Sequence, residues 1–259
     1  MKKYQILSVM ALVMLLPLNV YADPFPAGIP PVVSNNDGPP DIYNAFNRLV
    51  GTSHVDNSTL GTGVNRHVWD NGSPWAAALI GLTAGNTNTL GYYSDVGTGS
   101  VKTALFADSG FGFAAAGTQA DPYIGRAFDA PTPQFGWYLQ TAGEDSATYF
   151  SEPQLNTSDL NGNQQGYDHM MTFDLNQDLA LWVDFDGPGG APAQQVIFKN
   201  ASLITWEDLP FSNGDSDKDY DDMIYVVGRV APIPEPATML LLGSGLIGLA
   251  GYARRRFKK

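Results

Sequence analysis

From Trp75 onward, short apolar runs alternate with turn residues, and this pattern limits the folds open to the chain. In residues 171–175 every second residue is apolar, as in a strand with one buried face. Nine such runs, divided by Gly, Asn, Asp and Pro, predict a mainly β fold, an antiparallel β-sandwich of jelly-roll-like form. The absence of a fixed-period repeat argues against a solenoid or a propeller. The nine expected strands span residues 77–83, 101–106, 134–141, 147–152, 169–175, 179–185, 195–198, 202–206 and 223–230.

The segment before these strands predicts one short N-terminal helix. Residues 23–40 contain six prolines and suggest an extended lead-in. Asp41 then opens a helix over residues 41–50, and Gly51 is a natural stop. The helical spacing is set by the apolar residues Ile42, Tyr43, Phe46, Leu49 and Val50.

The first 22 residues predict a secretory signal peptide. Lys2 and Lys3 provide a positive n-region, and an apolar run covers residues 6–16. Val20-Tyr21-Ala22 suits signal peptidase, with cleavage after Ala22. The alternative is a buried N-terminal strand or helix.

The C-terminal end has a different order of features. The triplet Pro234-Glu235-Pro236 precedes 17 uncharged, mostly apolar residues over 237–253. That length just suffices for a transmembrane helix. The basic residues Arg254, Arg255, Arg256, Lys258 and Lys259 follow, and we expect them to stay cytoplasmic, with the body of the chain outside. Taken alone, these features also describe an ordinary tail anchor.

Composition excludes several classes of function. The chain has no cysteine, so disulfides, thiol catalysis and cysteine-ligated zinc or iron–sulfur centres are excluded. The net charge is −12, and residues 23–233 alone have 7 basic and 25 acidic residues, a net charge of −18. Such a body repels phosphates, so we expect no nucleic-acid partner, and it attracts cations.

Together, the Pro-Glu-Pro triplet, the glycine-rich apolar span and the arginine run resemble the PEP-CTERM sorting signal of Gram-negative bacteria, over about residues 230–259. That resemblance implies recognition by an exosortase, a membrane-embedded cysteine protease that cleaves near Pro234-Glu235-Pro236. The protein would then be released or attached at the surface, usually in organisms that make exopolysaccharide. It would be the substrate of that enzyme and membrane-anchored only before processing.

Three segments of the body resemble a second family, the domain of unknown function 4114 of secreted and surface bacterial proteins. They span residues 84–93, 167–173 and 206–223, and the core of the match is about 135–230. The family usually has Asn where this chain has Asp221, and either side chain offers an oxygen. We therefore expect an N-terminal part of the β body over 23–133, a sandwich similar to this family over 134–230 and the sorting signal over 231–259, and the body can be one domain or two.

One acidic loop is the chief candidate for chemistry. It holds five carboxylates, and two more lie shortly upstream. At two-residue spacing on an extended chain, alternate side chains point the same way and could converge. Ca²⁺ accepts six to eight oxygen ligands in flexible geometry and would neutralise such a cluster. The alternative is a solvated turn between two strands. The candidate ligands are Asp215, Asp217, Asp219, Asp221, Asp222, Glu207 and Asp208.

Enzyme motifs are weak. The histidines His54, His67 and His169 form no close pair or metal motif, and no Gly-x-Ser-x-Gly elbow is present. Glu207 with a loop aspartate could form a glycosidase pair, although carboxylate pairs are plentiful in an acidic chain. Sugar stacking is the role open to exposed aromatic residues, with core packing as the alternative. The aromatic candidates are Trp137, Tyr138, Tyr92 and Tyr93.

These patterns together predict a secreted, exosortase-processed protein of the extracellular matrix or cell surface, structural or adhesive in role and stabilised by Ca²⁺ if the acidic loop binds metal. Signal peptidase, exosortase and exopolysaccharide or other matrix components are the expected partners, and no catalytic residue is assigned. The alternative is a secreted carbohydrate-binding module or a weak glycan hydrolase.

Overall fold

The computed structural model describes Ile42, Ala45 and Leu49 and residues 67–230, apart from 71–73, 83, 85, 108–112, 131, 144–145, 160–165, 176, 188–189, 213, 215 and 217–218. Ile42, Ala45 and Leu49 are helical, while the other positions of the expected helix over 41–50 lie outside the described residues. The signal peptide over 1–22 and the sorting segment over 231–259 lie outside them as well.

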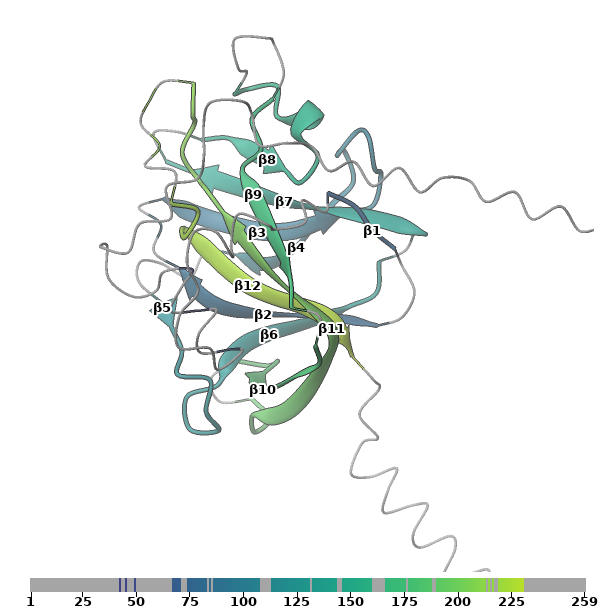
Figure 1. Ribbon diagram of the computed structural model, residues 1–259, viewed down its shortest axis with the longest axis vertical. Helices are drawn as coiled ribbons and strands as arrows, with labels where there is room; N and C mark the ends of the chain where they lie inside the picture. The colour runs from purple at the N-terminus through teal and green to yellow at the C-terminus, as the bar shows by residue number, and fades with distance from the viewer. Residues whose placement is uncertain are drawn as a thin grey trace, which may run out of the picture.

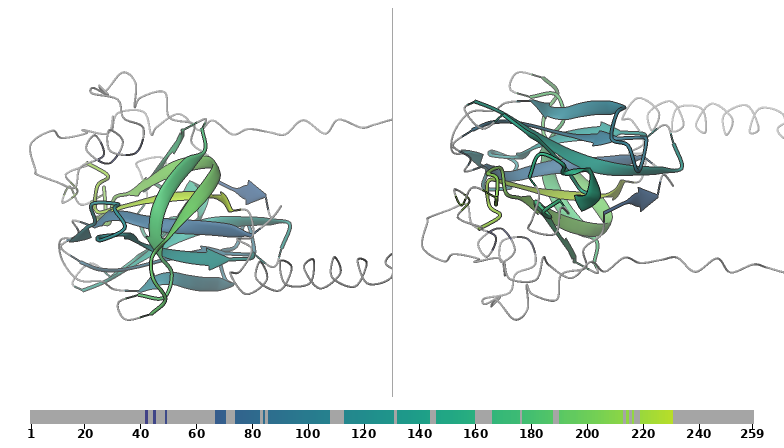
Figure 2. Two further views of the ribbon diagram at one scale, coloured as in Figure 1. Left: turned by 90° about the horizontal axis from the view of Figure 1, so that it is seen from below. Right: turned by 90° about the horizontal axis from the view of Figure 1, so that it is seen from above.

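The described strands form two sheets, which Figure 1 shows one above the other and Figure 2 shows from below and from above. The smaller, sheet I, has the order β1-β7-β3-β4, with β8 also paired to β7. The larger, sheet II, has the order β10-β6-β2-β12-β11-β9, with β5 paired to β2. Sheet I consists of β1 (Trp69–Asp70), β3 (Thr87–Tyr93), β4 (Lys102–Ala107), β7 (Gln134–Ala142) and β8 (Thr148–Phe150). Sheet II consists of β2 (Trp75–Leu82), β5 (Phe113–Ala114), β6 (Tyr123–Phe128), β9 (Met170–Asp174), β10 (Leu179–Asp184), β11 (Gln194–Trp206) and β12 (Met223–Val230).

Sheet II closes on itself through β10. This strand pairs antiparallel with the first half of β11 and parallel with β6, so β10, β6, β2, β12 and β11 form a ring. The closure depends on a bend in β11, where the register with β12 shifts between Lys199 and Ser202 and Asn200 has φ 48°. A bulge of this kind bends a strand, so the two halves of β11 can serve different neighbours.

The prediction of a mainly β fold is confirmed, and the two sheets are consistent with a β-sandwich. The antiparallel prediction needs one correction, because β10 and β6 run parallel through the pairs Val183↔Tyr123 and Asp184↔Ile124. A long stretch of chain separates β6 from β10, which leaves room for the crossover that a parallel pair requires.

Two apolar cores lie on opposite faces of β2 and β12. On β2, Ala78 and Ile80 face the core inside the ring, while Leu79 faces the core between the sheets. All eight residues of β2 are buried, because both of its faces are covered. A strand covered on both sides has a continuous apolar sequence instead of an alternating one.

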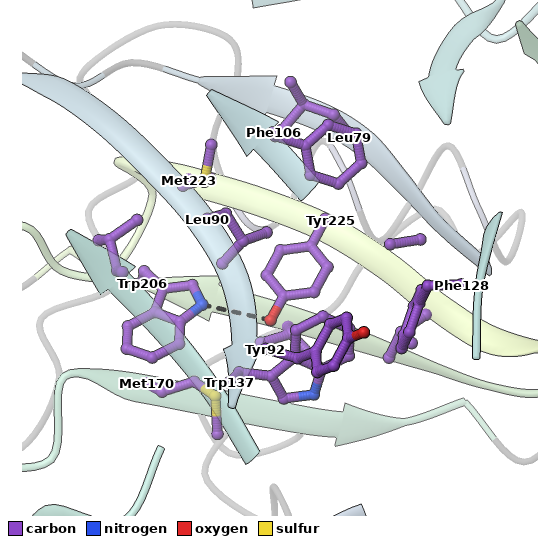
Figure 3. Close-up of a cluster of buried hydrophobic side chains, with 14 of the residues drawn as sticks. Leu79, Leu90, Tyr92, Phe106, Phe128, Trp137, Met170, Trp206, Met223 and Tyr225 are labelled. Atoms are coloured by element: carbon purple, nitrogen blue, oxygen red, sulfur yellow. Dashed lines mark hydrogen bonds between the residues drawn. The ribbon is translucent and has the colours of Figure 1, made fainter. Parts of the chain in front are cut away.

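The core between the sheets is rich in aromatic residues (Figure 3). Trp137 meets Phe135 and Tyr225 at ring-centroid distances of 5.5 and 5.3 Å, both edge to face. Trp206 Nε1 donates to Tyr225 Oη at 3.3 Å, which joins β11 to β12 within this core. Such edge-to-face pairs stabilise a fold beyond the area they bury.

The structure differs from the sequence expectation at several strands. The expected runs 195–198 and 202–206 are one strand, β11, because the bulge at Asn200 bends the strand without ending it. The strands β3 and β6 were not among the nine expected runs, because Gly91 and Gly125 interrupt their apolar residues. The strand expected over 223–230 is found unchanged as β12.

Among the described residues, no helix has the length and apolar character needed to cross a membrane. The expected membrane helix over 237–253 lies outside the part of the chain that the structure describes.

Candidate metal centre

The candidate site lies where β11 ends and β12 begins. Trp206 and Met223 are cross-strand partners, so the next residues outward, Glu207 and Asp222, come close at the same end of the ladder. Both belong to the acidic set predicted from sequence. The pairing of two strands thus brings together carboxylates that are 15 positions apart in the chain.

Three carboxylates converge there. One oxygen each of Glu207, Asp208 and Asp222 lies within 4.8 Å of the other two. Glu207 and Asp208 are buried, at 0% and 1% exposure, and Asp222 is partly exposed. Carboxylate oxygens at such spacing offer the hard oxygen ligands that Ca²⁺ and Mg²⁺ take.

Backbone N–H groups help to hold two of the three side chains, Asp222 and Glu207, in place. The N–H of Asp208 donates to Asp222 Oδ2 at 2.7 Å, and the N–H of Leu209 donates to Glu207 Oε1 at 3.3 Å. The cluster is therefore organised by its own chain turn and does not consist of loose surface side chains.

The opposite sheet also reaches this site. Asn88 of β3 donates from Nδ2 to Asp208 Oδ2 at 2.8 Å, and Asn86, which precedes β3, donates from Nδ2 to Asp208 Oδ1 at 3.4 Å. The Asp208 carboxylate therefore connects sheet I to the turn that follows β11 in sheet II.

The electrostatics of the cluster favour added positive charge. Burial, together with the negative charges of Asp208, Glu207 and Asp219, holds the pKa of the Asp222 carboxyl well above its usual value. Carboxylates this close must gain protons or a cation to relieve their repulsion. The four described Lys and Arg side chains make their recorded contacts elsewhere, namely Lys102 with Tyr138 and Phe150, Arg126 with Phe106 and Phe185, Lys199 with Asp178, and Arg229 with Trp75.

His169 contacts the backbone of the turn after β11. Its Nδ1 lies 3.1 Å from the backbone oxygen of Glu207, and its Nε2 lies 2.9 Å from Asp159 Oδ2. Asp159 also accepts from the backbone N–H groups of Phe211 and Ser212, at 2.7 and 2.9 Å. Burial would raise the pKa of Asp159, but these hydrogen bonds outweigh it and hold the pKa below its usual value.

Tyr220 lies between the buried Asp219 and Asp221 in the chain. Its backbone is left-handed, with φ 58°, and its hydroxyl donates to the backbone oxygen of Asp168 at 2.8 Å. The left-handed residue interrupts the extended backbone on which an even alternation of Asp215, Asp217, Asp219 and Asp221 would depend. Burial, with the charges of Asp168 and Glu207, raises the pKa of the Tyr220 phenol well above its usual value.

The predicted ligands divide into three groups. Glu207, Asp208 and Asp222 form the converging cluster described above. Asp219 and Asp221 are buried, at 6% and 5% exposure, and the N–H of Asp221 donates to Asp219 Oδ1 at 3.1 Å. Their burial differs from what a solvated turn would show. Asp215 and Asp217 lie outside the described residues.

Sequence reasoning missed Asn86, Asn88, Asp159 and the role of His169. The signal that could have found them is the set of three segments singled out in the sequence, 84–93, 167–173 and 206–223, because residues of all three meet at this site. Their meeting depends on contacts between residues up to 122 positions apart.

The aromatic residues proposed for sugar stacking are buried. Trp137 and Tyr93 are at 0% exposure, and Tyr138 and Tyr92 are at 3% and 6%. Trp137 and Tyr92 belong to the core between the sheets, as Figure 3 shows. These four residues therefore pack the fold and do not form a sugar-binding surface.

Comparison with known proteins identifies the C-terminal end. Residues 232–256 match the family model described as "PEP-CTERM protein-sorting motif". This motif supports an exosortase substrate and indicates a secreted protein with a C-terminal sorting signal. The predicted triplet Pro234-Glu235-Pro236 and the arginines Arg254, Arg255 and Arg256 lie inside the matched residues.

The other comparisons add little about the body. No curated protein matches the chain. One solved structure, the Chromobacterium violaceum lectin CV2L in complex with alpha-methyl-fucoside, matches with 7% identity and a TM-score of 0.27. The match covers 65% of this chain and 97% of the lectin chain. A TM-score this low supports no transfer of fold or ligand.

Proposed function

We propose that this protein is a secreted, exosortase-processed component of the extracellular matrix or cell surface, with a structural or adhesive role and a body stabilised by Ca²⁺. The sorting motif over 232–256 is the observation that carries the proposal. We further propose that the body belongs to the domain of unknown function 4114 family, which is supported by the sequence resemblance of residues 84–93, 167–173 and 206–223.

Two cleavages define the route to the surface. Signal peptidase cleaves after Ala22 and so removes residues 1–22. A Gram-negative exosortase then cleaves near Pro234-Glu235-Pro236. Until the second cleavage, the segment 237–253 anchors the chain in the inner membrane. The freed body, with its net charge of −18 over residues 23–233, joins exopolysaccharide or another matrix component.

The processing step has a direct test. Glu235→Ala, expressed in a host that contains exosortase, should accumulate as the longer membrane-bound form on immunoblots of fractionated cells. Lys259→Ala is the matched control, because it lies in the same tail but beyond the residues of the motif. Normal cleavage of the Glu235→Ala chain would contradict the sorting assignment.

The calcium part of the proposal is supported by the buried carboxylates Glu207 and Asp208 and by the partly exposed Asp222 beside them. A cation that binds only the folded state stabilises it by about 2.7 kcal/mol at a concentration 100 times its Kd. Ca²⁺ suits an irregular oxygen cluster better than Mg²⁺, which demands octahedral geometry.

Thermal unfolding of the full chain tests this part. After treatment with chelator, titration with Ca²⁺ should raise the melting temperature markedly and Mg²⁺ should raise it little. Glu207→Gln and Asp222→Asn should abolish the gain from Ca²⁺, whereas Asp186→Asn, an exposed loop residue of another connection, should keep it. An unchanged melting temperature of the wild type in excess Ca²⁺ would refute the calcium site.

A further inference from the structure

The side-chain amide of Asn88 has one atom that makes a hydrogen bond and one atom that makes none. The side chain is buried, at 1% exposure, and its Nδ2 donates to Asp208 Oδ2. Its Oδ1 is also buried, and it has no hydrogen-bond partner in the described structure. Buried carbonyl oxygens are ordinarily paired, because leaving one without a donor costs free energy.

The carboxamide group of Asn88 can face Asp208 with either end. Half a turn about the Cβ–Cγ bond exchanges the positions of Nδ2 and Oδ1, which are nearly equivalent in shape. The exchange would put Oδ1 about 2.8 Å from Asp208 Oδ2, where Nδ2 now lies. Two oxygens at such a distance repel each other unless a cation binds both.

We propose that Asn88 Oδ1 is a ligand of the cation bound by Glu207, Asp208 and Asp222, so that one Ca²⁺ ties β3 of sheet I to the β11–β12 turn of sheet II. This inference rests on the calcium site proposed above and adds a ligand from the opposite sheet. Side-chain amide oxygens are regular ligands of Ca²⁺.

The proposal gives the cation a structural task. Asn88 lies within β3, between β7 and β4, so a metal bond to its oxygen holds an inner strand of sheet I. Glu207 and Asp222 continue β11 and β12, which lie at the centre of sheet II. Calcium would therefore fasten the two layers at one end of the sandwich.

Variants at Asn88 test the ligand role by calorimetric titration of the full chain with Ca²⁺. Asn88→Ala should weaken the Kd for Ca²⁺ by about 10-fold or more. Asn88→Asp should keep or tighten the Kd, because a carboxylate still supplies the oxygen. Thr87→Ala, at the exposed first residue of the same strand, is the matched control and should leave the Kd for Ca²⁺ unchanged.

Loss of binding in Asn88→Asp to the same degree as in Asn88→Ala would overturn the inference, because it would make Asn88 only a hydrogen-bond donor to Asp208. The inference would also fail if Glu207→Gln abolished binding while Asn88→Ala bound Ca²⁺ normally, a result that leaves the calcium site intact. Absence of Ca²⁺ binding by the wild type would overturn both proposals together.

Hydrogen exchange of the wild type provides a measurement that needs no variant. Ca²⁺ should slow exchange of the amides of β3, Thr87–Tyr93, at least 10-fold more than those of β10, Leu179–Asp184, which lies outside the clamp. Equal slowing of both strands would overturn the inter-sheet clamp.

Discussion

At the scale of single residues, the site depends on polar groups that are buried and paired. Asp159, at 1% exposure, receives two backbone N–H groups of the segment after β11 and faces His169. These contacts keep the turn in the shape that presents Glu207 to the cluster, since His169 also meets the backbone oxygen of Glu207. Asp159 is thus a structural residue that positions the site.

Asp159→Ala should destabilise the fold by about 2–4 kcal/mol near neutral pH, because it leaves buried donors without their acceptor. The folded pKa of Asp159 is lowered, so its contribution is fully present above the unfolded pKa of about 4 and is lost as the pH falls through the folded pKa. Urea unfolding at pH 6 and pH 2.5 should therefore show a difference between wild type and variant that shrinks at the lower pH. The exposed Asp186→Ala serves as a control with little effect, and a difference independent of pH would contradict the account.

At the scale of elements, β11 decides the topology of sheet II. Its first half pairs with β10, and its second half pairs with β9 and β12. The bend between the halves depends on Asn200 at φ 48°, where Asn is tolerated better than most residues, and on the donation from the Asn200 N–H to Asp178 Oδ1 at 3.2 Å.

Asn200→Val should cost about 1–2 kcal/mol, because a β-branched residue adopts a left-handed backbone only with strain. Asn200→Gly should be neutral to within about 0.5 kcal/mol, since glycine accepts the same backbone. Position 200 is exposed, so the difference in stability between the two variants reports backbone strain and not lost packing. Gln195→Val, at an exposed extended position of the same strand, is the matched control and should change the free energy of unfolding little. Urea unfolding measures all three variants. Equal stability of Asn200→Val and Asn200→Gly would refute backbone strain at this position.

A second element-level feature is the close approach of β3 to β4. A Cβ added to Gly91 would lie 2.1 Å from the backbone oxygen of Thr103 and 2.6 Å from the Tyr138 ring. The register between these strands shifts at this point, between Leu90 and Gly91. Backbone cannot move away as a side chain can, so the strands require glycine here.

Gly91→Ala should destabilise the protein by about 3 kcal/mol or more, since the methyl group must displace strand backbone. Chemical denaturation monitored by tryptophan fluorescence measures the loss. Gly97→Ala has a positive φ of 89° but open space around the added atom, so it separates steric clash from backbone strain. A Gly91→Ala chain as stable as Gly97→Ala would contradict the clash.

At the scale of the whole molecule, strands from before and after residue 133 share both sheets. In sheet I, β3 pairs with β7, and in sheet II, β2 pairs with β12. The parts of the chain before and after residue 133 are therefore folded together.

The net charge of residues 23–233 is −18. The repulsion between these negative charges destabilises the compact folded state.

Salt should therefore stabilise the protein in the presence of chelator. Raising ionic strength from about 0.01 M to about 0.1 M shortens the Debye length from about 30 to about 10 Å and screens the repulsion. We expect the melting temperature to rise by a few degrees, equally for NaCl and KCl. A fall with added salt, or a response to only one of these salts, would show that net repulsion does not govern stability.

The sequence by itself determined the features that depend on patterns within one segment of the chain. The order of triplet, apolar span and arginines over residues 232–256 can be recognised without knowledge of the fold, because it is a pattern along one continuous segment. The β character and strand β12 also followed from local alternation and turn residues, and the acidic residues around 207–222 marked the region of the site.

Only the tertiary structure decided which of these residues meet. Periodicity did not reveal the closure of sheet II by β10, the continuity of β11 through Asn200 or the strands β3 and β6. Asn88 reaches Asp208 across 120 positions, and Glu207 meets Asp222 because β11 pairs with β12 in one register. Such contacts depend on packing between distant segments, and a pattern within one segment carries no record of its partner.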